Sequence, residues 1–139
     1  MRRIDFNPAH LVQIVAQVYL RLMPDDSFKE FVLDQLNALP GLRARAMFGA
    51  HGLYCGEKFF GILDQGRLFF KTDAKSQAEY ISRGMGSFTY LARGKKVALG
   101  FHEVPPDVLE NAPELTSWAR RAIQVAGNKL NARKAKKSK

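Results

Sequence analysis

The stretch 59–72 constrains the fold of this chain more than any other part of the sequence. Two largely apolar runs, 59–64 and 67–72, flank the dipeptide Gln65-Gly66. Apolar runs around a two-residue turn that contains glycine are typical of a β-hairpin. This turn pairs Leu63 with Leu68 across the two strands. Apolar residues fall on both faces of the hairpin, so we expect a sheet covered on one face and partly covered on the other.

The alternation of side chains assigns each residue of this hairpin to a face. One face is expected to hold Phe59, Gly61, Leu63, Leu68 and Phe70. The other face is expected to hold Phe60, Ile62, Asp64, Arg67, Phe69 and Lys71.

A second hairpin is expected over residues 88–103, with Gly94-Lys95 as its turn. This register brings apolar residues together on one face, which supports the pairing. It therefore sends Phe88 and Tyr90 into the core. The expected pairs are Phe88–Phe101, Tyr90–Leu99 and Ala92–Val97.

Helices are expected between and around these strands. Ser27 and Glu30 form a capping box, and the helix that they open ends at Pro40-Gly41. A short helix ends near Ser82, and the last helix begins at Asn111 and ends at Gly127. Hairpins with helices between them favour an α+β fold, a two-layer sandwich in which an antiparallel sheet packs against helices. The buried stripe of the last helix is expected to be Leu115, Trp118, Ala119, Ala122, Ile123 and Ala126.

The length of 139 residues corresponds to one domain. We expect an N-terminal extension helix over residues 1–26, a folded domain over 27–127 and a disordered basic tail over 128–139. Met23 would itself serve as a start of translation. Residues 1–22 are therefore either a genuine additional helix or an upstream extension of the reading frame.

Positive charge is concentrated at the C-terminus. The net charge is +9, and the last eleven residues carry six basic side chains and no acidic one. Removing these six charges leaves +3 for residues 1–128. A short Lys-rich tail of this kind is either a solubilising terminus or a segment that contacts nucleic-acid phosphates in a salt-dependent way.

A second group of basic residues belongs to the expected strands. Three basic side chains crowd the turn of the second hairpin, and two lie on the strand expected over 42–48. They either contact phosphates or mark solvated strand ends that discourage edge-to-edge pairing. No motif for base readout accompanies them. The candidate nucleic-acid contacts are Arg43, Arg45, Arg93, Lys95, Lys96, Lys134, Lys136 and Lys137.

Candidate catalytic and metal-binding groups are sparse. His51 and Cys55 are four residues apart, but a structural zinc site needs four ligands and a catalytic one about three. His102 and Glu103 are adjacent on a strand and so point to opposite faces. We expect a small buried Cys55, surface histidines, no metal, no cofactor and no enzymatic activity. The single cysteine, and the lack of a run of ~18 apolar residues, favour a cytoplasmic protein.

The nine residues Ala46–Tyr54 contain glycines three positions apart, at 49 and 52, which permit backbone conformations or close approaches that a Cβ would block. Four further segments follow in order over the stretch 28–126. Together with Ala46–Tyr54 they resemble the N-terminal domain of the TfoX competence regulators. The segments are Gly66–Lys71, Phe88–Tyr90, Glu103–Pro105 and Trp118–Arg121.

This resemblance implies an α+β fold and a function. TfoX regulators promote expression of DNA-uptake genes in bacteria, and they are thought to act together with the cAMP receptor protein at promoters. The resemblance implies a non-enzymatic regulatory or adaptor module that binds a protein partner, either the transcription machinery or a regulator. The apolar face of the expected N-terminal helix leaves a homodimer open as well, because it could pack on a second copy. The other function that the sequence leaves open is non-specific nucleic-acid binding by a small basic protein. Only the basic segment follows Ala126, so we expect a single-domain member of the family.

Overall fold

The computed structural model describes residues 25–47 and 49–137. The expected N-terminal extension helix and Phe48 lie outside the described residues. The elements are α2 (Asp25–Gln35), β1 (Leu42–Met47), β2 (Ala50–Cys55), β3 (Lys58–Asp64), β4 (Arg67–Lys71), α3 (Gln77–Ser82), β5 (Ser87–Ala92), β6 (Lys95–Glu103), α4 (Pro106–Leu109) and α5 (Ala112–Lys137).

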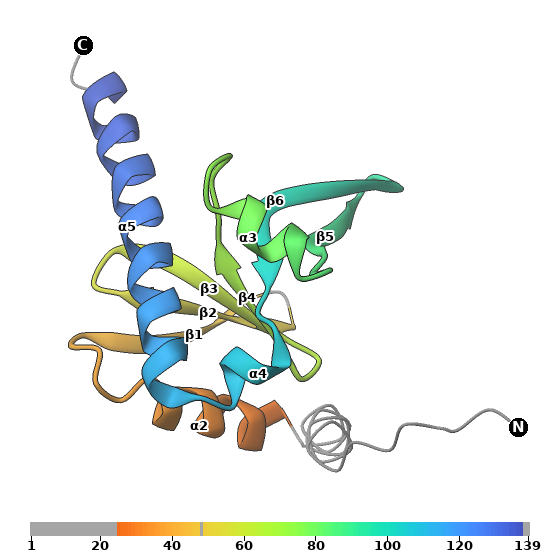
Figure 1. Ribbon diagram of the computed structural model, residues 1–139. Helices are drawn as coiled ribbons and strands as arrows, with labels where there is room; N and C mark the ends of the chain where they lie inside the picture. The colour runs from red at the N-terminus through yellow and green to blue at the C-terminus, as the bar shows by residue number, and fades with distance from the viewer. Residues whose placement is uncertain (1–24, 48, 138–139) are drawn as a thin grey trace, which may run out of the picture.

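Six strands form one open sheet in the order β1-β2-β3-β4-β6-β5. All neighbouring strands are antiparallel. Figure 1 shows α5 crossing the sheet and continuing beyond it, while the hairpin of β5 and β6 projects away from the rest of the domain. The expected α+β fold with an antiparallel sheet is therefore confirmed.

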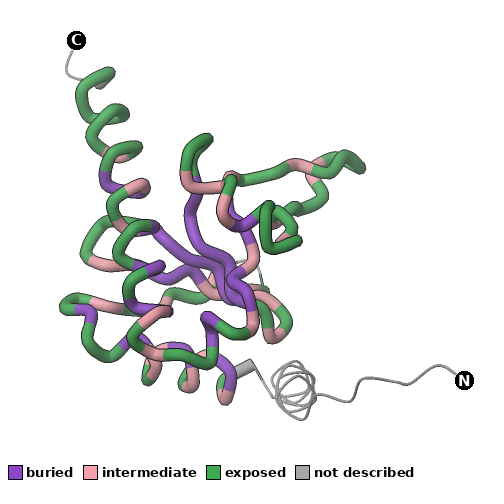
Figure 2. The backbone as a smooth tube through the Cα atoms, in the orientation of Figure 1, coloured by how far each residue is buried: buried purple, intermediate pink, exposed green. Residues whose placement is uncertain are grey.

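The main core lies between the sheet and the helices α2, α4 and α5, where the buried backbone is concentrated in Figure 2. The expected stripe of α5 is confirmed, with Ile123 only partly buried. Asn111 begins this helix as expected, because its side-chain oxygen accepts a hydrogen bond of 3.2 Å from the Glu114 amide. The largest fully buried side chains are Phe28, Phe60, Phe70, Leu36, Leu53, Ile62, Leu68, Leu115, Val32 and Val108.

The hairpin of β3 and β4 has the expected register, with Leu63 opposite Leu68. Gln65 and Gly66 have φ values of 49° and 73°, the left-handed conformation that a two-residue hairpin turn requires at both positions.

The expected faces of Phe59 and Phe60 were wrong. The register between β2 and β3 shifts at Leu53/Tyr54, where a bulge adds one residue to β3. A bulge reverses the alternation of side chains along the strand. Phe60 consequently joins the main core, whereas Phe59 joins a smaller cluster with Ile62, Phe69 and Phe101 on the other face of the sheet.

The expected register of the second hairpin was also wrong near its turn. Arg93 and Gly94 form the turn, with φ values of 53° and 79°, and Tyr90 faces Val97. Three residues of β6, 99–101, face the single residue Phe88, so that Ser87 pairs with His102. Tyr90 is consequently exposed, although Phe101 is buried as expected. The left-handed glycine at position 100, with φ of 76°, accommodates the extra residues.

The expected disorder of residues 128–139 was wrong for the part that the structure describes. Helix α5 runs from Ala112 to Lys137, and Gly127 lies inside it. Gly127 is buried, and a Cβ there would lie 3.2 Å from the Cε atom of Lys58. Glycine costs a helix interior about 1 kcal/mol relative to alanine, so close packing against Lys58 explains it better than helix termination. Within residues 25–47 and 49–137, no helix combines the length and apolarity needed to cross a bilayer.

Candidate functional site

A continuous series of ring contacts crosses the second face of the sheet. The Arg43 guanidinium lies 5.2 Å from the centroid of the Tyr54 ring. Tyr54 stacks on Phe59, and Phe59 contacts Phe101, each pair with centroids 5.0 Å apart. The Lys71 ammonium lies 4.7 Å from the centroid of the Phe101 ring. The series therefore begins and ends with a cation that lies over a ring face.

Gly52 leaves the space that this series requires. A Cβ at position 52 would lie 3.0 Å from the Phe59 ring and 3.1 Å from the Tyr54 ring. Both distances are shorter than an ordinary van der Waals contact, so a larger residue would displace one of the rings. The close approach that the sequence predicts for the glycines of Ala46–Tyr54 is therefore present at Gly52.

Lys71 is a buried cation at one end of the series. Its side chain is only 8% exposed, and its Nζ atom donates a hydrogen bond of 3.0 Å to the carbonyl of Leu99. A Cβ at Gly100 would lie 3.2 Å from this Nζ atom. The bulge in β6 thus both supplies the acceptor and leaves room for the ammonium.

The last turns of α5 close a groove over this region. The groove has a volume of about 370 Å³ and lies between α5 and the ends of strands β2, β3, β4 and β6. Lys129 and Arg133 are four residues apart on α5, which places them on one side of the helix. The residues that line the groove are Tyr54, Glu57, Phe59, Lys71, Leu99, Phe101, Ala126, Lys129, Leu130 and Arg133.

Positive charge dominates this groove. Burial and the nearby cations Lys129 and Arg133 together lower the pKa of Lys71 to about 8. Glu57 is the only acidic residue among those that line the groove, and it forms an ion pair of 3.1 Å with Lys134. The arrangement therefore favours an anion.

A second polar cluster, which contains His102, lies between β4 and β6. The sequence predicts a surface position for this histidine. His102 is instead 7% exposed, because it pairs with Phe70 of β4 and contacts Tyr80 on the side of the main core. The Thr72 hydroxyl donates to the Gly100 carbonyl at 3.1 Å and lies 2.8 Å from Nδ1 of His102. A hydroxyl has one hydrogen, so Nδ1 donates to Thr72 in the neutral ring. Burial lowers the pKa of His102.

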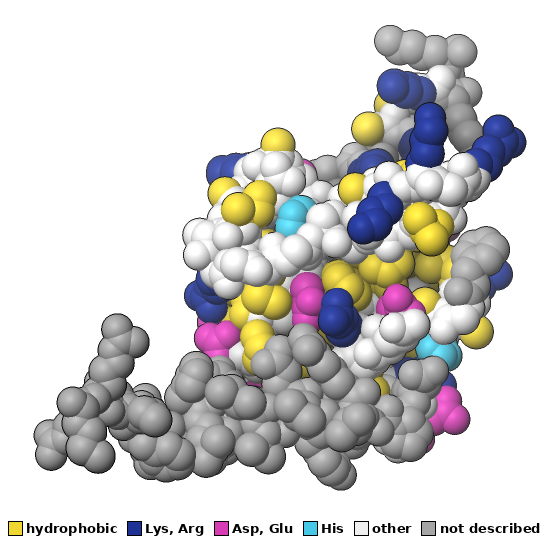
Figure 3. Space-filling model, turned by 90° about the vertical axis from the view of Figure 1, so that its right-hand side faces the viewer, with side chains coloured by type: hydrophobic (Ala, Val, Ile, Leu, Met, Phe, Trp, Pro, Cys, Tyr) yellow, Lys and Arg dark blue, Asp and Glu magenta, His cyan; other side chains and the backbone are white. Residues whose placement is uncertain are grey.

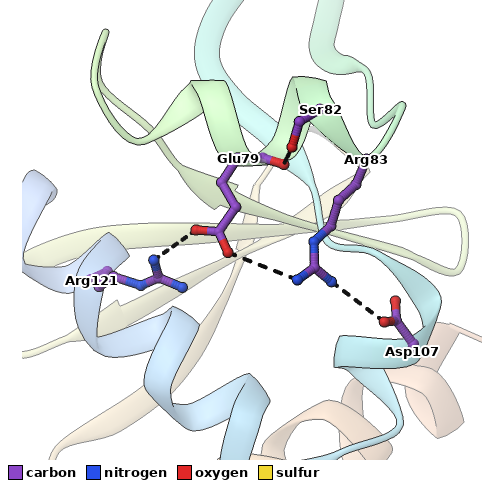
Figure 4. A network of polar contacts seen from close by, with 5 residues as sticks. All are labelled: Glu79, Ser82, Arg83, Asp107 and Arg121. Carbon is purple, nitrogen blue, oxygen red and sulfur yellow. Dashed lines mark hydrogen bonds and ion pairs between the residues drawn. The ribbon is translucent and has the colours of Figure 1, made fainter.

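An exposed ion-pair network joins α3, α4 and α5 (Figure 4). Glu79 forms ion pairs with Arg121 at 2.8 Å and with Arg83 at 3.9 Å, and Arg83 also pairs with Asp107 at 3.4 Å. Both guanidiniums lie over the Trp118 ring, at 5.0 and 5.1 Å from its centroid. The network holds the short helix α3 against α5, which is a structural role.

The segments that carry these contacts extend from β1 to α5. A family model described as the TfoX N-terminal domain matches residues 34–126 of the chain. The chain belongs to the TfoX N-terminal domain family. No curated protein matches the chain. The matched residues include the ring series and Lys71, whereas Lys129 and Arg133 follow the end of the match.

In this TfoX domain, the candidate nucleic-acid contacts lie in three separate places. Strands β1 and β5 are at opposite edges of the sheet, which separates Arg43 and Arg45 from the basic turn of β5 and β6. Arg43 also donates a hydrogen bond of 3.2 Å to the Gly56 carbonyl. Arg93, Lys95 and Lys96 are exposed at the tip of the projecting hairpin, and Lys134, Lys136 and Lys137 belong to the end of α5.

The TfoX domain also exposes apolar side chains on the β5–β6 arm, which we define as residues 87–99. Leu91 is 72% exposed, and Tyr90 and Leu99 are exposed as well. In Figure 3, apolar side chains lie open to solvent on the face seen there, with Lys and Arg side chains gathered toward its upper right. The arm therefore combines apolar and basic surface.

Among the described residues, no group of three or more His, Cys, Asp and Glu side chains is arranged to hold a metal ion. Cys55 is only partly buried, and its Sγ atom donates to the Pro40 carbonyl at 3.0 Å.

Lys71 is not among the site residues that the sequence predicts, and Lys129 and Arg133 are predicted only as charges of the tail. A lysine beside the apolar run 68–70, on the same strand face as Phe69, is a local signal for Lys71. The contribution of α5 could be foreseen only if its helix were known to continue past Gly127.

Proposed function

We propose that this TfoX N-terminal domain is a non-enzymatic regulatory or adaptor module that binds a protein partner through the β5–β6 arm. The observation that carries the proposal is the 72% exposure of Leu91 on a hairpin that projects from the domain. Large apolar side chains held in water on a projecting element favour burial against another surface. Tyr90 adds an aromatic group of the kind that dominates interface energetics.

The partner that we propose is the transcription machinery or a transcription regulator in the bacterial cytoplasm. This part of the proposal rests on family membership, because the TfoX regulators promote expression of genes for DNA uptake. The basic tip of the arm, with Arg93, Lys95 and Lys96, would suit an acidic surface on that partner.

A photo-crosslinking amino acid at position 91 tests the proposal in the native cell. The matched control is the same group at Gln124, an exposed position on α5. We expect a discrete, nuclease-resistant crosslinked species from position 91 and none from position 124. A species that contains only two copies of this chain would support a homodimer in place of a separate partner. Equal labelling from both positions would contradict a docking role for the arm.

Non-specific nucleic-acid binding is the second candidate function. The specific observation that favours it is that the basic segment is helical, because Lys129, Arg133, Lys134 and Lys136 lie on the last turns of α5. Cations held on a helix can contact a phosphate backbone without reading its sequence. A salt titration of binding to random DNA, with and without residues 129–139, tests this candidate.

A further inference from the structure

We infer that the groove between the end of α5 and the sheet is a binding site for a phosphate group, held by Lys71, Lys129 and Arg133. This inference deepens the second candidate function and rests on it only for the natural source of the phosphate.

Three cations of the chain meet around one cavity of about 370 Å³. Among the described residues, no carboxylate forms an ion pair with any of the three. The Lys71 ammonium donates to a carbonyl oxygen and lies over an aromatic ring, and both of these groups are neutral. An anion in the groove would relieve the repulsion between these cations and would accept the remaining hydrogen-bond donors.

Lys71 differs from a surface lysine because its side chain is buried in the groove. A surface lysine is solvated and gains little from an anion, because water screens the charge. Lys71 is more than nine-tenths buried, so a charge near its Nζ atom is screened less. Lys129 and Arg133 are exposed at the rim, where they would attract a ligand and then contact its other oxygens.

The aromatic wall limits the class of ligand. Each ring of the series already has neighbours: Arg43 and Phe59 at Tyr54, and Lys71 and Phe59 at Phe101. A nucleobase that stacked in the groove would need a free ring face. We therefore expect the site to recognise the phosphate and to be indifferent to the base.

A phosphate group has two natural sources, the backbone of a nucleic acid or a free phosphate monoester such as a mononucleotide. The test uses the full chain and three probes: inorganic phosphate, adenosine monophosphate and a single-stranded oligonucleotide of random sequence. Affinities are measured by calorimetry and by thermal shift at constant ionic strength, with chloride as the reference anion.

Two pairs of variants separate the site from general charge. Arg133→Gln is paired with Arg120→Gln, since both remove one exposed arginine from α5. Lys71→Met is paired with Lys75→Met, which removes an exposed lysine outside the groove. Arg133 is exposed, so Arg133→Gln should not disturb the core. This variant alone therefore still tests the site if Lys71→Met does not fold.

We expect inorganic phosphate to bind the wild-type chain, and we expect Arg133→Gln and Lys71→Met each to weaken it about tenfold. The affinities of the two control variants should stay within twofold of that of the wild type.

Phosphate binding that is absent, or that is weakened equally by Arg133→Gln and Arg120→Gln, would overturn the proposed site. If the site holds but the oligonucleotide binds no better than the mononucleotide, the site stands and the nucleic-acid function fails. An oligonucleotide affinity that is unchanged in both groove variants would support the nucleic-acid function and contradict the proposed site.

Discussion

The Nζ atom of Lys71 lies 4.7 Å from the centroid of the Phe101 ring, and the two residues are paired across β4 and β6. The same ring contacts Phe59 on β3, so one buried aromatic residue connects three strands. Phe101 is 2% exposed. Much of the order of the second face of the sheet therefore depends on this residue.

Replacing Phe101 with alanine should lower the free energy of unfolding by about 3–5 kcal/mol, as for other buried aromatic residues. Urea unfolding followed by circular dichroism measures the change. Leu91→Ala is the control, because Leu91 is exposed in the unbound domain and its truncation should change stability by no more than about 0.5 kcal/mol. Equal effects of the two substitutions would refute the packing of this face.

Replacing Gly52 with alanine should destabilise the domain by about 1–3 kcal/mol, because the new Cβ would collide with Phe59 and Tyr54. Gly86→Ala is the matched control, since a Cβ there would have no neighbour within 4 Å. Chemical denaturation compares the two variants. A Gly52→Ala variant with an unchanged free energy of unfolding would mean that the ring series is not tightly packed.

Stability should fall when the pH drops below about 6.5, through protonation of His102. Burial lowers the pKa of His102 in the folded state, so the unfolded chain takes up a proton first. The stabilisation is therefore fully present above the unfolded pKa and is lost as the pH falls toward the folded pKa. Thermal melts between pH 7.5 and 5 measure this loss, which should be smaller in His102→Gln than in His51→Gln.

Phosphate affinity should decline as the pH rises through about 8, because Lys71 loses its proton there. The charged groups around this ammonium are Lys129 and Arg133 on α5, together with Glu57, Glu79 and Arg121. Each glutamate already has a basic partner, Lys134 or Arg121. Calorimetry at pH 7 and pH 9 measures the change, after correction for the pH dependence of phosphate itself. An affinity that is the same at both pH values in the wild type and in Lys71→Met would contradict a role for Lys71.

Deleting residues 129–139 should weaken binding to random duplex DNA and make its dependence on salt shallower, because six positive charges are removed. The fold should persist, since the side chains described in this segment are exposed or only partly buried. Binding by the full chain should be micromolar or weaker at physiological salt, roughly as for other non-specific binders. Fluorescence anisotropy measures both affinities. Tight binding that survives the deletion would direct attention to Arg43, Arg45 and the basic tip of the arm.

Local chemistry made much of the fold predictable. Gln65-Gly66 can form a left-handed two-residue turn, which sets the register of β3 and β4. The apolar spacing of α5 and the cap at Asn111 likewise act within a few residues of the chain. These features depend on backbone conformation and periodicity, so the amino-acid sequence by itself determined them, together with the excess of positive charge at the C-terminus.

The groove was decided by the tertiary structure. A bulge in β3 moved Phe59 to the second face, and a bulge in β6 supplied the carbonyl acceptor and the space for the Lys71 ammonium. A bulge depends on how two strands meet rather than on either strand alone. The strand order separated Arg43 from the basic turn, although both looked alike as strand-end charges. Packing of Gly127 against Lys58 accompanied the continuation of α5, which brought Lys129 and Arg133 over the sheet. Each of these outcomes depends on contacts between residues far apart in the chain, and such contacts have no local signature.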